Sequence, residues 1–232
     1  MANAYHEYIS RCQFVLRQGK AVADILYLTP EGAPHVFRPP HSALEGDDVL
    51  PDKKGFSFDG CSPQMLMDNA NVTDNCIFFP GGASYRVLVL SNFQTMTPEL
   101  LKKLDELLKK GAVIVGNPSL KSPSLVGYPE CDDEVKKLSM NIWNSFEIPE
   151  KETEISYGKG KLYWGGNYAK TDSTEIYPDY ESTANLLGKL EVQEDFLSSG
   201  SLRYTHRIDG DRDIYFVSNR TDTIVFDTCS FR

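Results

Sequence analysis

The sequence has little that points to a membrane, a nucleic acid or a secretion signal. No apolar run approaches the roughly 20 residues that span a bilayer. Lys and Arg number 24 against 33 Asp and Glu, so the 232 residues carry a formal charge of −9. This excess of acidic residues argues against a nucleic-acid partner, because a phosphate-binding surface needs clustered cations. Glu7 and Arg11 interrupt any apolar core of an N-terminal signal peptide. We therefore expect no nucleic acid and no membrane among the partners.

Motifs for cofactors and metals are also absent. Neither GxGxxG nor GxxxxGK(S/T) occurs, and residues 80–84 favour a hairpin turn over a phosphate cradle. Near Asp209, Asp211 and Asp213, Ile214 and Arg220 stand where a calcium-binding EF-hand loop has Gly and Glu. We expect no cofactor and no metal site.

The cysteines give no redox or zinc pattern. No two lie within four residues of each other, which excludes a CxxC motif or a zinc ribbon. We interpret most of them as small buried apolar side chains and leave disulfide bonding open. The five are Cys12, Cys61, Cys76, Cys131 and Cys229.

The clearest structural pattern is an alternation of strands and helices typical of the α/β class. Residues 85–91 and 112–116 are apolar strands, and between them Thr97 and Pro98 begin a helix with a leucine stripe that Gly111 ends. A crossover of this length predicts that the two strands are parallel. Further strands are expected at 21–28, 56–58, 76–79, 155–157 and 161–164.

Four more helices are expected. Residues 5–18 form an apolar face at spacings of three and four, and Ser62 with Pro63 begins a helix whose Met65, Leu66 and Ala70 point inward. Asp132 or Asp133 is expected to cap a third helix, and residues 182–189 form the fourth. Residues 30–57, rich in Pro, Gly and His, are expected to form a long loop.

The C-terminal residues have a different character. Strands are predicted at 201–208, 213–219 and 223–227, with a turn at Asp209 and Gly210. Three short strands do not make an independent domain. Either they dock on the α/β domain or they begin a β-module whose remainder is missing, and we favour the second interpretation.

One residue stands where α/β proteins present a nucleophile. Cys61 follows a predicted strand and precedes a predicted helix. A thiol nucleophile needs a histidine base. The sequence around Cys61 also lacks the Gly two residues after the nucleophile that a sharp turn prefers. A buried cysteine is therefore the favoured interpretation. The candidate bases are His6, His35, His41 and His206.

Other candidate groups are less distinctive. No carboxylate pair stands out as the two acids of a glycosidase, so we assign no catalytic residue and leave the binding residues undefined. Aromatic side chains near predicted loops could stack on sugar rings, although we expect most of them in the core. These are Phe37, Tyr128, Tyr163, Trp164, Tyr168 and Tyr177.

Several stretches, in this order, resemble the later part of the glycoside hydrolase family 106 α-L-rhamnosidases, and together they cover nearly the whole chain. They are RCQFVLRQGKAVADILYL (11–28), FSFDGCSP (56–63), FFPGGASYRVLVL (78–90), MTPELLKKLDELLKKGAVIVG (96–116), SPSLVGYPECDDEV (122–135), YGKGKLYW (157–164) and LRYTHRIDGDRDIYFVSN (202–219).

The resemblance implies a large secreted or periplasmic enzyme that removes rhamnose from plant polysaccharides such as pectins. In that family a barrel domain with the acid/base pair and a calcium site precedes the region seen here. Residues 1–195 would form a three-layer, flavodoxin-like or class I glutamine amidotransferase-like α/β domain with a mixed, mostly parallel sheet. Residues 196–232 would open a truncated β-sandwich module.

The resulting hypothesis is a non-catalytic ancillary domain whose partner is the catalytic barrel of its own parent chain, and possibly a polysaccharide. The loops after Leu28, Ser91 and Gly116 follow parallel strands and are candidates for contact with substrate. Two alternatives stay open. One is a carbohydrate-binding or assembly module, and the other is a small amidase or hydrolase that uses Cys61.

Overall fold

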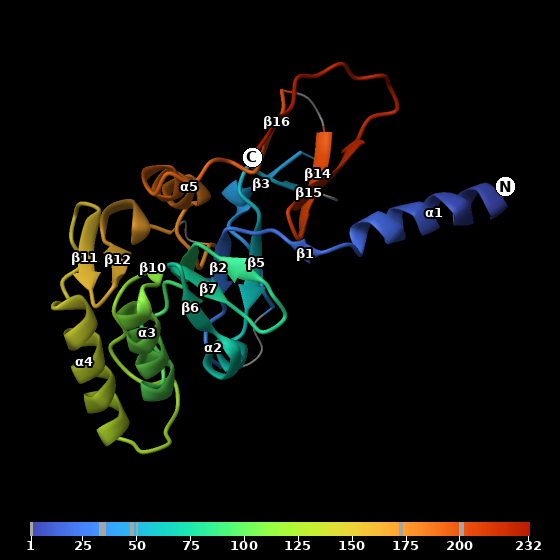
Figure 1. Cartoon of the computed structure of the whole chain (residues 1–232). Coiled ribbons are helices and arrows are strands. Elements are labelled where there is room, and N and C mark those ends of the chain that lie inside the picture. The colour runs from blue at the N-terminus through green and yellow to red at the C-terminus, as the bar shows by residue number, and fades with distance from the viewer. Residues whose placement is uncertain (1, 33–35, 47–48, 50, 172–173, 200–201) are drawn as a thin grey trace.

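The computed structural model describes residues 2–32, 36–46, 49, 51–171, 174–199 and 202–232 (Figure 1). Its main feature is a six-stranded sheet in the order β11-β12-β10-β9-β2-β5. Five neighbouring strands run parallel, and β11 pairs antiparallel at one edge. The expected α/β class with a mostly parallel sheet is confirmed. The strands are β2 (Ile25–Leu28), β5 (Phe58–Cys61), β9 (Val87–Leu90), β10 (Val113–Val115), β11 (Thr153–Tyr157) and β12 (Gly160–Trp164).

The sheet is buried on both faces because its central strands are apolar throughout. In β9, Leu88 and Leu90 belong to one core cluster, while Val87 and Val89 belong to the other. Helices must therefore cover both sides. The leucine face packs against α2 (Pro63–Asn69), α3 (Pro98–Lys110) and α4 (Glu130–Trp143), and the valine face packs against α5 (Tyr180–Lys189).

Helix α3 confirms the predicted crossover between β9 and β10. Thr97 Oγ1 accepts a hydrogen bond from the Leu100 backbone N–H at 3.3 Å, and Pro98 takes the first turn. Gly111 ends the helix with a φ of 120°, a backbone conformation that favours glycine. The predicted stripe is buried against the sheet and consists of Leu100, Leu101, Leu104, Leu107 and Leu108.

Two predicted details of other helices are wrong. Neither Asp132 nor Asp133 caps α4, which begins after Pro129, and Asp132 accepts a hydrogen bond from the Ser122 N–H instead. Met65 is 52% exposed, whereas Leu66 is buried. Adjacent helical residues point about 100° apart, and the core contact of α2 takes Leu66 but not Met65.

Helix α1 (Ala2–Leu16) matches the predicted helix but buries none of its residues. It extends away from the sheet (Figure 1), and the rings of Tyr5, Tyr8 and Phe14 are exposed. Its apolar face is thus not covered by the described part of the chain. No helix among the described residues is long and apolar enough to cross a membrane.

The C-terminal residues form an antiparallel hairpin of β14 (Leu202–Asp209) and β15 (Arg212–Asn219), as predicted. Strand β14 also pairs with β1 (Lys20–Ala21), which joins the hairpin to the N-terminal part of the chain. The strand predicted over 21–28 is therefore divided between two sheets. The strand predicted at 223–227 is wrong, because that segment pairs with no strand among the described residues. Instead, β16 (Ser230–Phe231) pairs with β13 (Phe196–Leu197).

Small elements complete the chain. The predicted turn at 80–84 joins β7 (Cys76–Phe78) to β8 (Ser84–Tyr85), and β6 (Asn71–Thr73) lies on the other side of β7. The described part of 30–57 holds only short elements, in agreement with the expected loop. These are η1 (His41–Ala43), β3 (Leu44–Glu45) and β4 (Asp52–Lys53), and η2 (Gly166–Tyr168) lies later in the chain.

Candidate functional site

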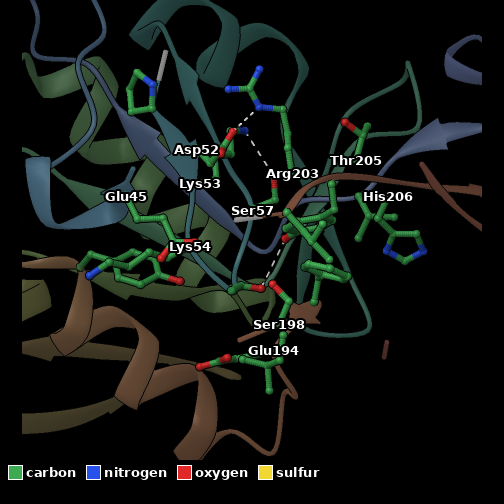
Figure 2. Close-up of a pocket in the computed structure, with 18 of the residues that line it drawn as sticks. Glu45, Asp52, Lys53, Lys54, Ser57, Glu194, Ser198, Arg203, Thr205 and His206 are labelled. Carbon is green, nitrogen blue, oxygen red and sulfur yellow. Dashed lines mark hydrogen bonds and ion pairs between the residues drawn. The ribbon is translucent and has the colours of Figure 1, made fainter. Parts of the chain in front are cut away.

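A polar cleft of about 570 Å³ lies between the α/β body and the C-terminal hairpin. Four parts of the chain line it: β1 with the residue after it, the segment from β3 to β5, the segment from α5 to β13, and β14 (Figure 2). Labelled side chains in that view include Glu45, Lys53, Glu194 and Arg203. The pairing of β1 with β14 brings these distant segments together.

Lys53 is held on one side of this cleft. Its Nζ donates to Ser57 Oγ at 3.2 Å and to the carbonyl of Phe58, and lies 3.7 Å from Asp59 Oδ1. It also lies 4.6 Å from the centre of the Phe58 ring. Burial lowers the pKa of Lys53, and the nearby Asp59 carboxylate opposes that shift. The cation is therefore fixed in position and already paired.

The acidic side of the cleft has carboxylates in two different states. Glu181 pairs with Lys54 at 3.0 Å. The side-chain carboxylates of Glu194 and Glu45 make no hydrogen bond or ion pair within the described part of the chain. Burial, and then the neighbouring Glu181, raise the pKa of Glu194. The cleft thus offers two carboxylates that can accept hydrogen bonds from a ligand.

Arg203 and Arg220 attach the hairpin to β4 through one carboxylate. Arg203 Nε contacts Asp52 Oδ1, and Arg220 lies 2.7 Å from Asp52 Oδ2. Asp52 is mostly buried, so both of its oxygens are occupied at the edge of the cleft. This pairing positions the wall of the cleft and leaves Asp52 with little capacity for a ligand.

His206 separates the cleft from a second cavity of about 730 Å³ on the other side of β1. Its Nδ1 lies 2.7 Å from Asp195 Oδ1, and its Nε2 lies 2.9 Å from Asp213 Oδ1. The ring stacks on Tyr215 at 4.0 Å between centroids. Both ring nitrogens thus contact carboxylates, and the imidazole joins Asp195 to Asp213 in a wall that the two cavities share.

The second cavity ends on a buried ion cluster. Arg232 Nη1 lies 3.0 and 3.1 Å from the two oxygens of Asp24, and Nη2 lies 3.3 Å from Asp195. Asp24 is 3% exposed and Asp195 is fully buried. Burial raises the pKa of Asp24, and Arg232 is the main group that opposes the shift. This cluster links Arg232 in the C-terminal segment to Asp24, which lies between β1 and β2.

The structure does not support Cys61 as a nucleophile. The residue ends β5 and is buried, and burial raises the pKa of its thiol to about 11. Its Sγ donates to the Ser62 carbonyl at 3.2 Å, and no histidine of the described residues contacts it. His206 is engaged by Asp195 and Asp213, and His35 lies outside the described residues. An activated thiol needs the opposite environment.

The loops after two of the three parallel strands are covered by a later segment of the chain. Asn92 donates to the Ala169 carbonyl at 2.9 Å and accepts from Asn117 Nδ2 at 2.7 Å. Tyr177 donates to the Leu28 carbonyl at 3.1 Å and is buried. Of the loops proposed for contact with substrate, those after Leu28 and Ser91 are therefore covered by the segment before α5.

The remaining candidates have structural roles. Asp213 binds His206, and Asp209 pairs with Arg212. In the described part of the chain no three His, Cys, Asp or Glu side chains gather where they could hold a metal ion. Tyr163, Trp164, Tyr168 and Tyr177 are buried, as expected for most of the aromatic candidates, whereas Tyr128 is exposed.

The cleft residues carried no motif in the sequence. The nearest signal was the long Pro/Gly-rich segment at 30–57, since irregular loops of that length in compact domains are often functional. The contacts between this segment and β14 span about 150 positions of the chain; the Arg203–Asp52 pair, for example, is separated by 151. Single-sequence patterns do not report such pairings.

Comparisons with known proteins agree with this architecture. A family model described as alpha-L-rhamnosidase, glycoside hydrolase family 106, matches residues 1–232. A protein of Formosa agariphila named "Putative beta-glucuronidase" is 32% identical over 218 residues, which are 93% of this chain and 16% of that protein. The rhamnosidase structure from Novosphingobium sp. PP1Y superposes with a TM-score of 0.67 at 23% identity, over 93% of this chain and 19% of that one.

These matches define the class as glycoside hydrolases. The chain belongs to glycoside hydrolase family 106, the alpha-L-rhamnosidase family, as the resemblance of its sequence segments indicated. The chain spans less than a fifth of the length of the two relatives. The structural match supports the fold.

Proposed function

We propose that this chain is a non-catalytic ancillary domain of an α-L-rhamnosidase-like glycoside hydrolase. The observation that carries the proposal is the family match over residues 1–232 combined with the small share, 16% and 19%, that the chain covers of its relatives. A domain of this size leaves room elsewhere in such proteins for the catalytic machinery. The environment of Cys61 favours this role over an amidase.

The proposed ancillary domain is flavodoxin-like and comprises residues 1–195. Counted in chain order, its parallel strands follow the order 2-1-3-4-6, and strand 5 (β11) is the antiparallel edge. This matches the doubly wound order 2-1-3-4-5 if the edge strand is set aside. The likeness to class I glutamine amidotransferases is one of fold alone. Residues 196–232 would begin a β-sandwich module.

The proposed partner is the catalytic barrel of the same parent protein, which would act on a pectic polysaccharide outside the cell or in the periplasm. The exposed rings of Tyr5, Tyr8 and Phe14 on α1 are consistent with a contact to such a neighbour. The alternative, a carbohydrate-binding module, is favoured by one observation, the polar cleft with its two unpaired carboxylates.

The test is hydrolysis of 4-nitrophenyl α-L-rhamnopyranoside by the 232-residue chain. The proposal predicts no release of 4-nitrophenol above the rate in buffer. Turnover that Glu194→Gln abolishes and Glu150→Gln leaves intact would refute it, because Glu194 lines the cleft with a raised pKa and Glu150 is an exposed carboxylate outside it.

A further inference from the structure

We propose that the cleft between β4, α5 and β14 binds a neutral oligosaccharide. This inference deepens the proposed function, because it gives the ancillary domain a ligand, but it rests on the geometry of the cleft. The volume of about 570 Å³ lies within the range of about 300–1,000 Å³ that is usual for small-molecule sites.

The polar groups of the cleft select the chemical class of the ligand. An apolar ligand would remove the carboxylates of Glu45 and Glu194 from water without giving them a hydrogen bond, which is costly. A sugar hydroxyl can donate to a carboxylate and accept from an ammonium group at the same time. Ser57 and Thr205 add hydroxyls to the lining. A polyhydroxylated ligand is the class that satisfies all of these groups.

The charge of the cleft selects a neutral sugar over an acidic one. Five carboxylates line it, and its three basic side chains, Lys53, Lys54 and Arg203, are already paired with three of them. The unpaired charges that remain are therefore negative. A uronate group would meet like charge in a partly desolvated site, which opposes binding.

Ring surfaces in the same cleft offer an apolar face. Tyr204 is half-buried and stacks on Phe196 at 4.7 Å between centroids. Tyr180 also lines the cleft but is buried, and its hydroxyl oxygen accepts a hydrogen bond from the Phe56 N–H. The C–H face of a pyranose can pack on the half-buried Tyr204 ring while its hydroxyls reach the carboxylates and lysines.

A ligand here would contact segments that lie far apart in the sequence, from Glu45 to Thr205. Binding should therefore stabilise the docking of the hairpin on the α/β body, because a ligand that binds only the native arrangement raises the stability of that arrangement. This gives a readout that does not depend on catalysis.

The experiment is a titration of the 232-residue chain with rutinose, a neutral rhamnosyl-glucose disaccharide, and in parallel with digalacturonic acid, followed by calorimetry and thermal unfolding. We expect saturable rutinose binding with a Kd on the order of 1 mM, and a higher Tm with rutinose only. Glu194→Ala and Glu45→Ala should each weaken binding about tenfold. Glu150→Ala should leave the Kd unchanged.

Three results would overturn the inference. They are no saturation by rutinose at tenfold the expected Kd, equal or tighter binding of digalacturonic acid, and equal effects of the cleft and control substitutions. Circular dichroism shows whether each variant is folded, and Glu45 and Glu194 lie on different segments, so one misfolded variant leaves the other as the test. Failure of binding leaves the rhamnoside assay and the proposed ancillary role unaffected.

Discussion

Removal of the Arg232 guanidinium is predicted to destabilise the fold through the buried Asp24 and Asp195 carboxylates. Arg232→Met keeps much of the side-chain volume but takes away the cation that lies 3.0 Å from Asp24 and 3.3 Å from Asp195. Breaking a buried ion pair by removing one partner costs about 3–5 kcal/mol. The Arg232 side chain is 25% exposed, so we expect the lower end, about 3 kcal/mol.

This loss should depend on pH with a definite sign. Burial raises the folded-state pKa of Asp24, and without Arg232 it should rise further. Between the unfolded value of about 3.9 and that raised value, the folded state keeps a proton that the unfolded state releases. Stability is therefore retained at acid pH and lost as the pH rises through the folded pKa. The difference between wild type and variant should be largest at neutral pH and shrink on acidification.

The assay is urea unfolding of wild type and Arg232→Met between about pH 5 and 8, with Arg212→Met as the control. Arg212 pairs with Asp209 on the surface, where an ion pair contributes about 0–1 kcal/mol. In thermal unfolding, a loss of about 3 kcal/mol corresponds to roughly 6–12 °C for a chain of this size. A loss below about 1 kcal/mol, or a loss that grows on acidification, would refute the reasoning.

Two further predictions concern local features. Thr97→Ala should lower the free energy of unfolding, measured in urea, by about 1–2 kcal/mol, because it removes the cap on the Leu100 N–H and a 2.6 Å hydrogen bond to Glu31. Thr97→Ser keeps the hydroxyl and should stay within about 0.5 kcal/mol of wild type. Equal losses in the two variants would contradict the capping role. Cys61 should react slowly with iodoacetamide at neutral pH, and the reaction rate should rise only towards pH 11, because burial raises the pKa of the thiol to about 11. Mass spectrometry of the labelled peptide follows the reaction. Fast labelling at pH 7 would contradict the buried environment.

Local and periodic features of the fold could be predicted from the sequence. The unit from β9 through α3 to β10 follows from Thr97, Pro98, the leucine stripe and Gly111, all of which act within a few residues. The turn at Gly210 and the hairpin around it are local in the same way. In these segments propensity, capping and burial agree.

Features that depend on distant partners could not be predicted. Asp24 divides the strand expected over 21–28, because its carboxylate is turned to Arg232, 208 positions away. Lys53 and Arg203 become neighbours of one cleft through the pairing of β1 with β14. The segment at 223–227 has the composition of a strand, but a strand forms only where an edge is available to pair with it.

The most direct test is one NMR sample of the labelled 232-residue chain with rutinose. We expect shifts of the amide signals of Glu45, Lys54 and Glu194, and no new anomeric signals over a day, because the bound disaccharide is not hydrolysed. Unshifted cleft amides would contradict the binding site. Signals of free rhamnose and glucose would contradict the non-catalytic role.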